Sequence, residues 1–395
     1  MSAQEYRAPE SVNRLQMSAL AVGAIALVLG CFLGLRSPES KDAFFRAYLM
    51  GYMLVLGFAL GSLGLLMLQH LTSGQWGILI RRPLESATRT IPLLVVLFAP
   101  IFFFGLEHLY GAWLHPNAPL SKMQVTWLTP SGYRMRAVIY FLVWFGLMFI
   151  FNRWSRQQDV NREDRALRRR FKMLAGPGII LYVFSLSFAV IDWVMSISPH
   201  WASTIYGFLF VAGQLISSMA LMVIIVVLLA RTGPFAGVLH KRHLWQFGGF
   251  LFTFNMLWAY FSFSQLLIIW SGNLPEEISF YRSRLYSSWG IVAVIVLIFH
   301  FFVPFFLLLS KDLKRNQRLL PKVAMWMIFM RLVDLYWYTQ PEFYPGNALP
   351  NALDFVLPIA LIGIWLGYFA WNLKREPLLP LGDPKLAEAI AHHEH

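Results

Sequence analysis

The sequence predicts an all-α, polytopic membrane protein with ten transmembrane helices and both termini on the cytoplasmic side. Three observations support this prediction. The 395 residues are 57% hydrophobic and only 13% charged, so there is too little charge to cover a water-soluble domain. Ten apolar segments of about 20 residues are each long enough to cross a bilayer. Most Lys and Arg residues lie in alternate loops, as membrane topology requires.

The ten predicted spans leave no soluble segment large enough to fold alone. They are expected at residues 14–35, 44–71, 85–111, 132–153, 172–196, 202–230, 244–271, 286–310, 321–340 and 352–373. Each should be a helix, because lipid offers backbone groups no hydrogen-bond partner. We therefore expect one integral membrane domain over residues 1–395, with transmembrane helices between 14 and 373 and a cytoplasmic tail at 374–395.

The first two spans have simple local features. Residues 1–16 mix acidic and basic side chains, and no small-residue cleavage site stands out after the first span, which is expected to remain as an uncleaved helix. The second span carries a small-residue face that should let another helix approach closely. This face consists of Gly51, Gly57, Gly61 and Gly64.

Proline and glycine interrupt several later spans. Pro92 and Pro100 lie in the third, Pro304 in the eighth and Pro358 in the tenth, while the fifth opens on a Gly-Pro-Gly sequence at residues 176–178. Proline removes a helical hydrogen bond, and membrane helices tolerate it where neighbouring groups satisfy the freed carbonyl. Kinks are expected near Pro100 and Pro304.

Tyrosine and tryptophan residues lie mostly near the ends of the predicted spans. We interpret most of them as an interfacial belt that anchors the helices at the membrane surface. They are Tyr133, Tyr140, Trp144, Trp154, Trp193, Trp201, Tyr336, Trp337 and Tyr338.

Basic residues predict the orientation. One side, which holds both termini and the loops after spans 2, 4, 6 and 8, contains 24 of the 33 Lys and Arg residues, eight of them at residues 153–172. The opposite side contains 8, and Arg331 lies within a span. Loops rich in Lys and Arg stay cytoplasmic, so the net charge of +13 follows from topology and does not indicate nucleic acid. The run at residues 168–170 suggests a solvated face or contact with anionic lipids.

Cysteine usage restricts the cofactors that this chain can hold. Its single cysteine, Cys31, lies in the first span, so no disulfide, iron–sulfur cluster, c-type haem or thiolate zinc site is expected within the chain. His392, His393 and His395 resemble a metal-binding tract but belong to a polar tail. We predict no metal site and no catalytic residue, and any electron cofactor should belong to a partner.

Several titratable residues fall inside the apolar spans. They are Glu107, His108, Asp192, His300, Arg331, Asp334 and Asp354. Each costs roughly 2.5 to 3.5 kcal/mol in hydrocarbon, so such groups usually pair, line a wet cavity or pass protons. We take these seven as candidates for proton transfer. The alternative for each is a satisfied hydrogen bond or ion pair between helices.

The orientation would bring several of these candidates together. Odd-numbered spans should run outward, which places Glu107, His108, Asp192 and Asp334 in the outer half of the membrane, on the side where Asp354 opens span 10. His300 lies near the middle of span 8. A buried acid and a histidine can both accept and release protons.

Two smaller patterns leave alternatives open. Arg331 and Asp334 are three residues apart on one helix, which allows a direct pair that neutralises both charges. Tyr260 and Gln265 in span 7, together with His300, could bind a quinone head group. Hydrogen bonds between helices suffice to explain the same residues.

Three segments resemble one known family. Residues 258–278 (WAYFSFSQLLIIWSGNLPEEI), 192–207 (DWVMSISPHWASTIYG) and 71–85 (LTSGQWGILIRRPLE) are similar to the F subunit of bacterial alternative complex III. That subunit is in turn similar to the polysulfide-reductase membrane-subunit (NrfD-like) family. The resemblance covers nearly the whole chain, including ten spans with both termini inside.

The resemblance implies an architecture and a set of partners. The fold would have two four-helix bundles, spans 2 to 5 and 6 to 9, flanked by spans 1 and 10. The partners would be a related ten-helix C subunit with the main quinol site, an iron–sulfur B subunit, multihaem and monohaem cytochrome c subunits, small membrane subunits, lipids and in some cases a terminal oxidase. The complex would oxidise menaquinol or ubiquinol in the bacterial inner (plasma) membrane.

The function expected from the resemblance is that of a non-redox membrane subunit. It would supply scaffold and proton-transfer half-channels to a quinol-oxidising respiratory complex, without a redox cofactor of its own. One alternative is a membrane anchor that itself binds quinol. A secondary transporter is another alternative, because midplane charges and helix breakers also occur in transporters.

Overall fold

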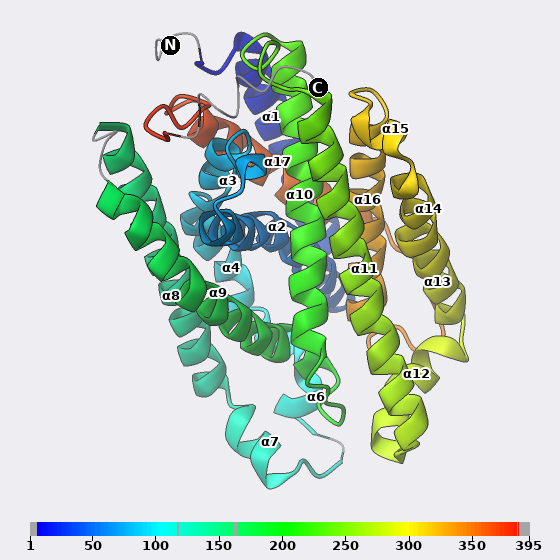
Figure 1. The fold of residues 1–395 in the computed structure, drawn as a ribbon. Coiled ribbons are helices and arrows are strands. Elements are labelled where there is room, and N and C mark those ends of the chain that lie inside the picture. Colours follow the sequence, from blue (N-terminus) through cyan, green and yellow to red (C-terminus); the bar gives the residue numbers. More distant parts are fainter. Residues whose placement is uncertain (1–5, 117, 161–164, 385, 387–395) are drawn as a thin grey trace.

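Long apolar helices make up most of the structure (Figure 1). The computed structural model describes residues 6–116, 118–160, 165–384 and 386, and this part of the chain contains no β-strand. Nine helices within the described residues are long and apolar enough to cross a membrane. They are Glu10–Gly34, Pro38–Thr72, Arg81–Phe103, Pro130–Val160, Ala166–Ile197, Tyr206–Arg231, Lys241–Gly272, Trp289–Leu309 and Leu353–Leu373. The chain is therefore an all-helical, multi-pass membrane protein.

One further long helix corresponds to the ninth predicted span. This helix, α16 (Leu320–Thr339), has 20 residues but carries Lys322, Arg331 and Asp334. All three charges fall within its apolar stretch, so it is not counted among the nine. It packs against α10 (Tyr206–Arg231) and α2 (Pro38–Thr72).

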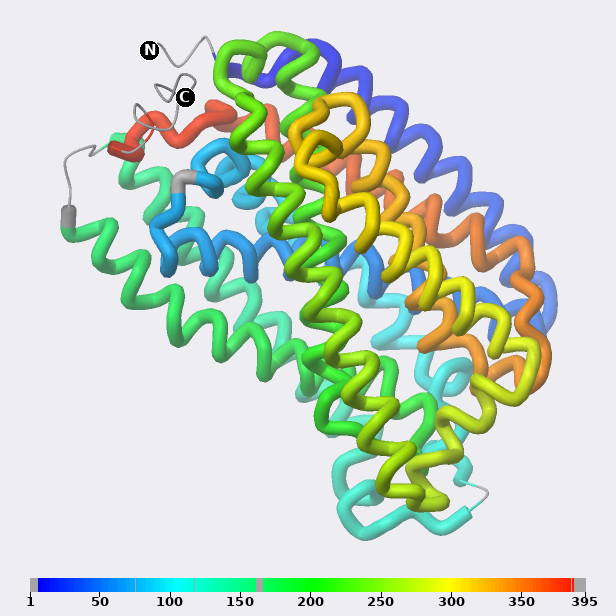
Figure 2. The backbone as a smooth tube through the Cα atoms, turned by 45° about the vertical axis from the view of Figure 1, so that its right-hand side comes forward, coloured from blue at the N-terminus to red at the C-terminus, as the bar shows by residue number. Residues whose placement is uncertain are grey.

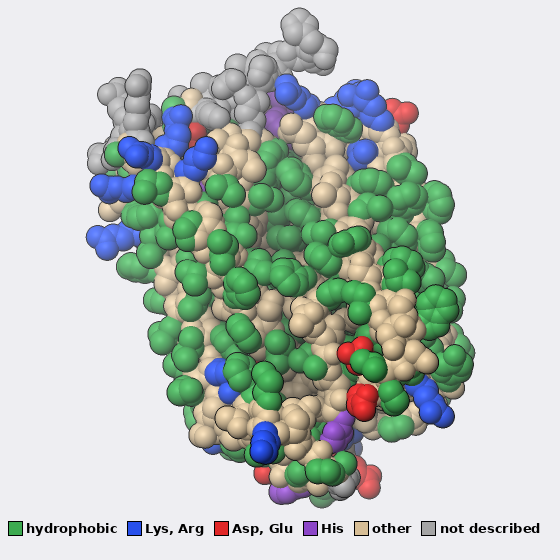
Figure 3. Space-filling view, turned by 60° about the horizontal axis from the view of Figure 1, so that its bottom comes forward, with side chains coloured by type: hydrophobic (Ala, Val, Ile, Leu, Met, Phe, Trp, Pro, Cys, Tyr) green, Lys and Arg blue, Asp and Glu red, His purple; other side chains and the backbone are tan. Residues whose placement is uncertain are grey.

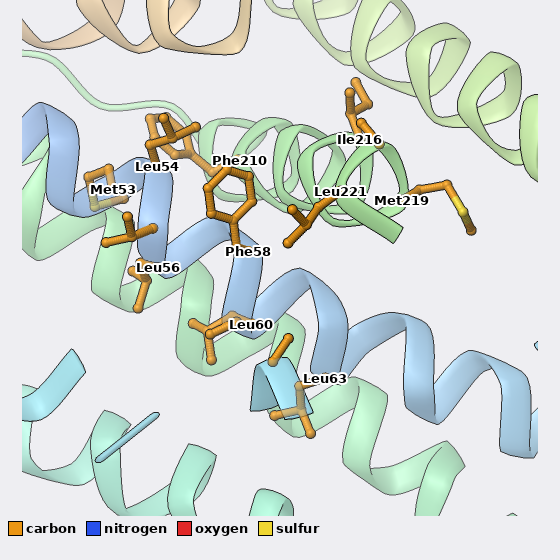
Figure 4. Close-up of a cluster of buried hydrophobic side chains, with 14 of the residues drawn as sticks. Met53, Leu54, Leu56, Phe58, Leu60, Leu63, Phe210, Ile216, Met219 and Leu221 are labelled. Atoms are coloured by element: carbon orange, nitrogen blue, oxygen red, sulfur yellow. The ribbon is translucent and has the colours of Figure 1, made fainter. Parts of the chain in front are cut away.

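Helices α2 and α10 form the centre of the molecule. The apolar stretch of α2 is entirely buried inside the protein and that of α10 is 83% buried, so these two helices meet other helices rather than lipid along most of their length. Figure 4 shows the two helices crossing with buried side chains from both, including Phe58 of α2 and Phe210 of α10. A methyl group at Gly61 would overlap the backbone of Gln214. The predicted small-residue face is thus confirmed, because only glycine permits this close approach.

The remaining helices pack around this central pair. Helix α9 (Arg165–Trp193) lies against both central helices and against α8 (Pro130–Val160). Helix α11 (Lys241–Gly272) packs along α10. Helix α1 (Glu10–Gly34) runs beside α17 (Leu353–Leu373), which in turn contacts α2, so the first and last long helices are neighbours (Figure 2).

The third predicted span is broken and shorter than expected. It consists of α3 (Arg81–Thr88) and α4 (Ile91–Phe103). Pro92 lies in the first turn of α4, where the missing N–H costs nothing. The span was predicted to reach residue 111 but ends at Phe103. Beyond it the chain forms two single turns, α5 (Leu106–Leu109) and α6 (Gly111–Leu114).

The eighth span contains a π-helical segment. Helix α13 (Trp289–Ile295) leads into π-helix at Val296–Phe302, and α14 (Val303–Leu309) follows. Pro304 has no N–H to donate to the carbonyl of His300, four residues earlier. The backbone around that point shifts to five-residue hydrogen bonds, as in Val303 N–H to Ile298 O. The disturbance predicted near Pro304 is thus present as a π-helix.

Short helices and loops close the two ends of the molecule. At the end away from the termini lie α5, α6, α7 (Lys122–Trp127) and α12 (Pro275–Leu285). At the opposite end α15 (Lys311–Arg315) joins α14 to α16. The backbone N–H of Leu378 donates to Tyr6 O at 2.8 Å, so the two described ends of the chain meet on one side.

The outer surface is apolar across the middle. Many large hydrophobic side chains there are exposed, among them Phe184, Phe263 and Ile291. Figure 3 shows hydrophobic side chains over the central part of the face, with charged side chains mainly toward its two ends. This pattern is that of a protein whose middle is covered by lipid tails.

The predicted aromatic belt is wrong for most of its members. Trp144, Trp193 and Tyr133 are fully buried inside the protein, and Trp201 and Tyr338 are nearly so. Trp193 packs at 4.5 to 6.2 Å, between ring centroids, against rings from three other helices, α2, α4 and α8. These aromatics fill the space between helices, because bulky rings also pack well where helix ends splay apart.

Candidate functional site

A buried ion pair lies in the second half of the chain. Arg331 Nη1 donates to Asp334 Oδ2 within α16, and both side chains are shielded from solvent. This pair confirms the prediction made from their three-residue spacing. The guanidinium also lies 5.2 Å from the centre of the Phe210 ring. It occupies space that exists only because residue 213 of α10 is glycine, since a methyl group there would overlap it.

A large cavity opens beside Asp334. It has a volume of about 940 Å³ and lies between α11, α12, the segment from α13 to the π-helix, and α16. Trp258, Ser262 and Trp337 line it together with Asp334. The polar atoms Trp258 Nε1, Ser262 Oγ, Trp337 Nε1 and Asp334 Oδ1 are buried but make no hydrogen bond of normal geometry within the described residues.

His300 lies next to this cavity, in the π-helical segment. Its ring centroid is 4.3 Å from that of Trp258, and the side chain is buried. Neither ring nitrogen has a hydrogen-bond partner among the described residues. The structure therefore brings His300 and the Arg331–Asp334 pair close to one indole, whereas the other four candidates for proton transfer lie elsewhere. We name Trp258, His300, Arg331 and Asp334 the cavity cluster.

Asp192, by contrast, is held by four hydrogen bonds. Arg136 Nε and Nη2 each donate to one carboxylate oxygen at 2.8 Å. Tyr140 Oη donates at 2.7 Å and Trp127 Nε1 at 2.8 Å. All these donors favour the ionised carboxylate, so the arrangement is that of an interhelical ion pair. It favours the structural alternative for Asp192.

Glu107 and His108 lie outside the apolar helix in which they were expected. The helix ends at Phe103, and the Glu107 side chain is 67% exposed beside His115, at 3.2 Å. His108 stacks on Phe45 and contacts Asp42 Oδ1 through Nδ1 at 2.7 Å. The expectation that both acid and histidine lie deep in hydrocarbon is therefore wrong, because the backbone turns away after residue 103.

Glu107 and His108 nevertheless share a polar pocket. This pocket has a volume of about 650 Å³ at the end of the molecule away from the termini, and Asp42, His200 and Glu342 also line it. Glu342 pairs with the buried Arg284 at 2.9 Å. Burial lowers the pKa of the Arg284 guanidinium, an effect that the charge of Glu342 opposes.

Asp354 has a local structural role. Its Oδ2 accepts a hydrogen bond from the backbone N–H of Asn351 at 2.9 Å, while Asn351 Oδ1 accepts one from Leu353 N–H at 2.7 Å. Such reciprocal contacts cap the first turn of a helix, here α17. The structure does not bring Asp354 into the cavity cluster.

The three quinone-binding candidates are separated. Tyr260 is 64% exposed on the apolar outer surface. Gln265 is buried, accepting a hydrogen bond from Ser203 Oγ at 2.9 Å and donating one to Tyr281 Oη at 3.1 Å. Burial raises the pKa of Tyr281 to about 12, so its hydroxyl is neutral near pH 7. Tyr281 lines the 940 Å³ cavity, whereas Tyr260 and Gln265 do not.

An arginine-rich network at the opposite end was missed by the sequence analysis. Glu85 accepts hydrogen bonds from Arg81 Nε at 3.0 Å, Arg82 Nη1 at 2.7 Å and Ser155 Oγ at 2.5 Å. All of these side chains are buried. The signal lay in the three- and four-residue spacing of Arg81, Arg82, Glu85 and Arg89, which places opposite charges on one helical face.

The C-terminal segment completes this network. Glu376 accepts ion pairs from Arg82, Arg89 and Arg156, and Asp383 pairs with Arg81 Nη1 at 3.0 Å. Asp159 of α8 also pairs with Arg82. We call this set of residues the arginine network. It consists of Arg81, Arg82, Glu85, Arg89, Asp159, Glu376 and Asp383.

Polar side chains at the α2–α10 contact were also missed. Tyr182 Oη donates to Gln214 Oε1 at 3.1 Å, and Ser62 and Ser218 lie 3.4 Å apart. Such uncharged residues give no signal against an apolar background, since they occur singly in spans that are otherwise hydrophobic. They place hydrogen-bonding groups in the centre of the molecule.

The arrangement offers two kinds of chemistry. The cavity cluster can exchange protons or bind a polar group, whereas every charged side chain of the arginine network takes part in an ion pair, which suits a structural role. Within the described residues, no three His, Cys, Asp or Glu side chains are grouped so as to hold a metal ion, and the histidines at 392, 393 and 395 lie outside those residues.

Comparison of the sequence with family models and with curated proteins finds no match.

Proposed function

We propose that this chain is a non-redox membrane subunit of a quinol-oxidising respiratory complex of the alternative complex III kind, in which it provides scaffold and proton-transfer groups. The observation that carries the proton role is the cavity cluster. It contains a buried carboxylate with one oxygen paired to Arg331 and the other on a cavity wall beside the Trp258 indole, without a hydrogen bond of normal geometry, next to a buried histidine. The assignment to a complex rests on the resemblance of residues 71–85, 192–207 and 258–278.

The proposed topology has ten spans in two four-helix bundles. The first would contain α2, α3 with α4, α8 and α9, and the second α10, α11, α13 with α14, and α16, while α1 and α17 flank them. Contacts of α2 with α9, of α8 with α9 and of α10 with both α11 and α16 support this grouping. The basic loops support cytoplasmic termini.

Proton transfer would run through the outer half of the second bundle. Asp334 and His300 can each gain or lose a proton, and Arg331 would stabilise the ionised form of Asp334. Asp42, Glu107 and His108 line a polar pocket at the outer end of the molecule and would provide an entry from that side. In this proposal Asp192 is structural because both of its carboxylate oxygens accept hydrogen bonds from protein donors. Asp354 is structural because its Oδ2 caps α17; its Oδ1 has no partner among the described residues, but the side chain does not line the cavity.

The partners follow from the resemblance. They would be the related ten-helix C subunit, the iron–sulfur B subunit, the multihaem and monohaem cytochromes c and small membrane subunits, within the bacterial inner membrane. All clusters and haems would lie in those partners, and menaquinol or ubiquinol would be oxidised there. Tagging this chain and isolating it from native membranes tests the assignment. Recovery as a free monomer, without haem or iron–sulfur protein, would contradict it.

The proton role is tested by the substitution Asp334→Asn in the isolated complex. Asparagine keeps the size of the side chain but cannot carry a proton. We expect proton release per quinol oxidised to fall while the haem subunits still co-purify. Asp312→Asn, which changes an exposed carboxylate in α15, is the matched control and should behave like the unmodified protein. If Asp334→Asn leaves the number of protons released per quinol unchanged, the proposed proton role is wrong and only the structural role remains.

A further inference from the structure

Four polar atoms that make no hydrogen bond of normal geometry within the described residues gather on the wall of one cavity. They are Trp258 Nε1, Ser262 Oγ, Trp337 Nε1 and Asp334 Oδ1, in the 940 Å³ cavity between α11 and α16. Native proteins partner more than about 90% of their buried polar groups, because a group left unpartnered destabilises the folded state. Trp258 and Asp334 interact with each other, although not with normal hydrogen-bond geometry, and the Ser262 and Trp337 groups beside them have no partner among the described residues. This wall therefore indicates a ligand that completes its hydrogen bonds.

The volume and walls of the cavity fit an organic ligand better than water alone. Ligand pockets in proteins measure about 300 to 1,000 Å³, and a water molecule takes about 30 Å³. Apart from the four polar atoms the walls are mostly aliphatic and aromatic, with Phe301, Val296 and Ala259 among the lining residues. Water gains few hydrogen bonds against such walls.

The mouth of the cavity faces the lipid. Its rim includes Phe263, Ile291 and Val294, whose side chains are 63%, 67% and 53% exposed on the apolar belt of the molecule. Because this surface meets acyl chains, a ligand enters from the bilayer and can leave an apolar tail there. The occupant is therefore a lipid with its head group inside.

The polar wall specifies the head group. Indole N–H groups can only donate, so they require oxygen acceptors. Trp258 and the Asp334 carboxylate interact with each other, so Ser262 Oγ and Trp337 Nε1 are the groups left entirely to a ligand, and a ligand hydroxyl can also donate to Asp334 Oδ1. Arg331 already balances the charge of Asp334. A charged head group would disturb this balance at low dielectric, so an uncharged one is favoured.

We infer that this cavity binds the head of an uncharged lipid that carries at least one hydroxyl and a second oxygen, with its tail in the bilayer. Two sources share this chemistry, an isoprenoid quinol and a neutral glycerolipid. The site differs from the quinone site expected at Tyr260 and Gln265, neither of which lines the cavity. The inference does not depend on the proposed proton role, because binding can be measured without turnover.

The test measures binding to the purified full-length protein in lipid nanodiscs. Radiolabelled decylubiquinol and dioctanoylglycerol are the neutral probes, and dioctanoylphosphatidylglycerol is the charged one. Saturable binding of the first or the second identifies the source, and the charged probe should not compete. If neither neutral probe binds saturably, or if the charged probe competes equally well, the inference is wrong.

Substitutions locate the binding site. Ala293→Phe fills the cavity from its wall and should weaken binding at least tenfold, whereas Ile295→Phe adds a ring to the same helix outside the cavity wall and should leave binding unchanged. Trp337→Phe and Ser262→Ala each remove one donor and should weaken binding about fivefold. These two changes alter little volume, so they remain informative if the larger one disturbs folding. Equal binding by all four variants would place the lipid elsewhere.

Discussion

Arg136 of α8 and Asp192 of α9 form a bidentate ion pair, in which Nε and Nη2 of the guanidinium donate to the two carboxylate oxygens at 2.8 Å. The carboxylate is fully buried, while the guanidinium reaches the pair from a partly exposed position. The contact ties two long helices together at the end of the molecule away from the termini. It also leaves Asp192 no free oxygen for proton exchange.

Asp192→Asn should destabilise the protein. Asparagine removes the negative charge and leaves Arg136 partly buried without a counter-ion, which costs about 3 kcal/mol in comparable pairs. Thermal unfolding in detergent, followed by circular dichroism, measures the loss. The double change Arg136→Met with Asp192→Asn should recover part of it. A single variant as stable as the unmodified protein would show that the ion pair contributes nothing.

Gly213→Ala should be destabilising although alanine favours helices. The added methyl group would overlap the Arg331 guanidinium, and such overpacking costs about 1 to 3 kcal/mol. Gly146→Ala is the matched control in α8, since nothing lies within 4 Å of a methyl group there. It should stabilise by up to about 1 kcal/mol. The same unfolding assay compares them, and equal effects would mean that Arg331 moves freely.

The arginine network should respond strongly to loss of its central acid. Glu85→Ala leaves Arg81 and Arg82 short of a buried partner, for an expected cost of about 3 to 5 kcal/mol. Glu376→Ala should cost less, because its side chain is 19% exposed. Glu276→Ala, at an exposed position of α12, should stay within about 0.5 kcal/mol. Equal losses for all three acids would argue against a buried network.

Tyr281 should make stability fall at alkaline pH. Burial raises its pKa from 10.0 to about 12, so the unfolded chain loses this proton first. The contribution of the Tyr281 phenol to stability is complete below about pH 10 and is lost as the pH rises toward about 12, by up to about 3 kcal/mol. The measurement is the difference in unfolding free energy between the unmodified protein and Tyr281→Phe across this range.

The control for that measurement is a tyrosine in solvent. Tyr286 is 88% exposed, so Tyr286→Phe should show no change in relative stability over the same range. A flat difference for Tyr281→Phe as well would mean that the Tyr281 phenol is not desolvated in the folded protein.

Patterns within one helix were predictable from the sequence. The Arg331–Asp334 pair followed from a three-residue spacing, and the close contact at Gly61 followed from a row of glycines on one face. Both patterns depend on helical geometry alone, which is known once a segment is recognised as a helix. The i to i+4 spacing of Arg81 and Glu85 carried the same kind of signal. Arg81 and Arg82, however, lie before residue 85, where the predicted third span begins.

Contacts between distant segments were not predictable in this way. Asp192 and Arg136 are 56 residues apart, and Arg82 meets Glu376 across 294 residues. Hydropathy describes each residue's own surroundings and says nothing about which other helix faces it. Glu107 was misplaced for a related reason, since residues 104–111 are apolar enough to extend the helix but the backbone turns after Phe103.

The sequence by itself determined that this is a helical, multi-pass membrane protein. The length and apolar character of a segment are local properties, and they decide whether that segment can span the hydrocarbon core of a bilayer. Only the tertiary structure decided which buried charges are satisfied. Helix packing gave Asp192 four hydrogen bonds and left one oxygen of Asp334 on a cavity wall without a hydrogen bond of normal geometry. In a low-dielectric interior this difference in partners, and not the residue type, separates a structural acid from one that can take part in function.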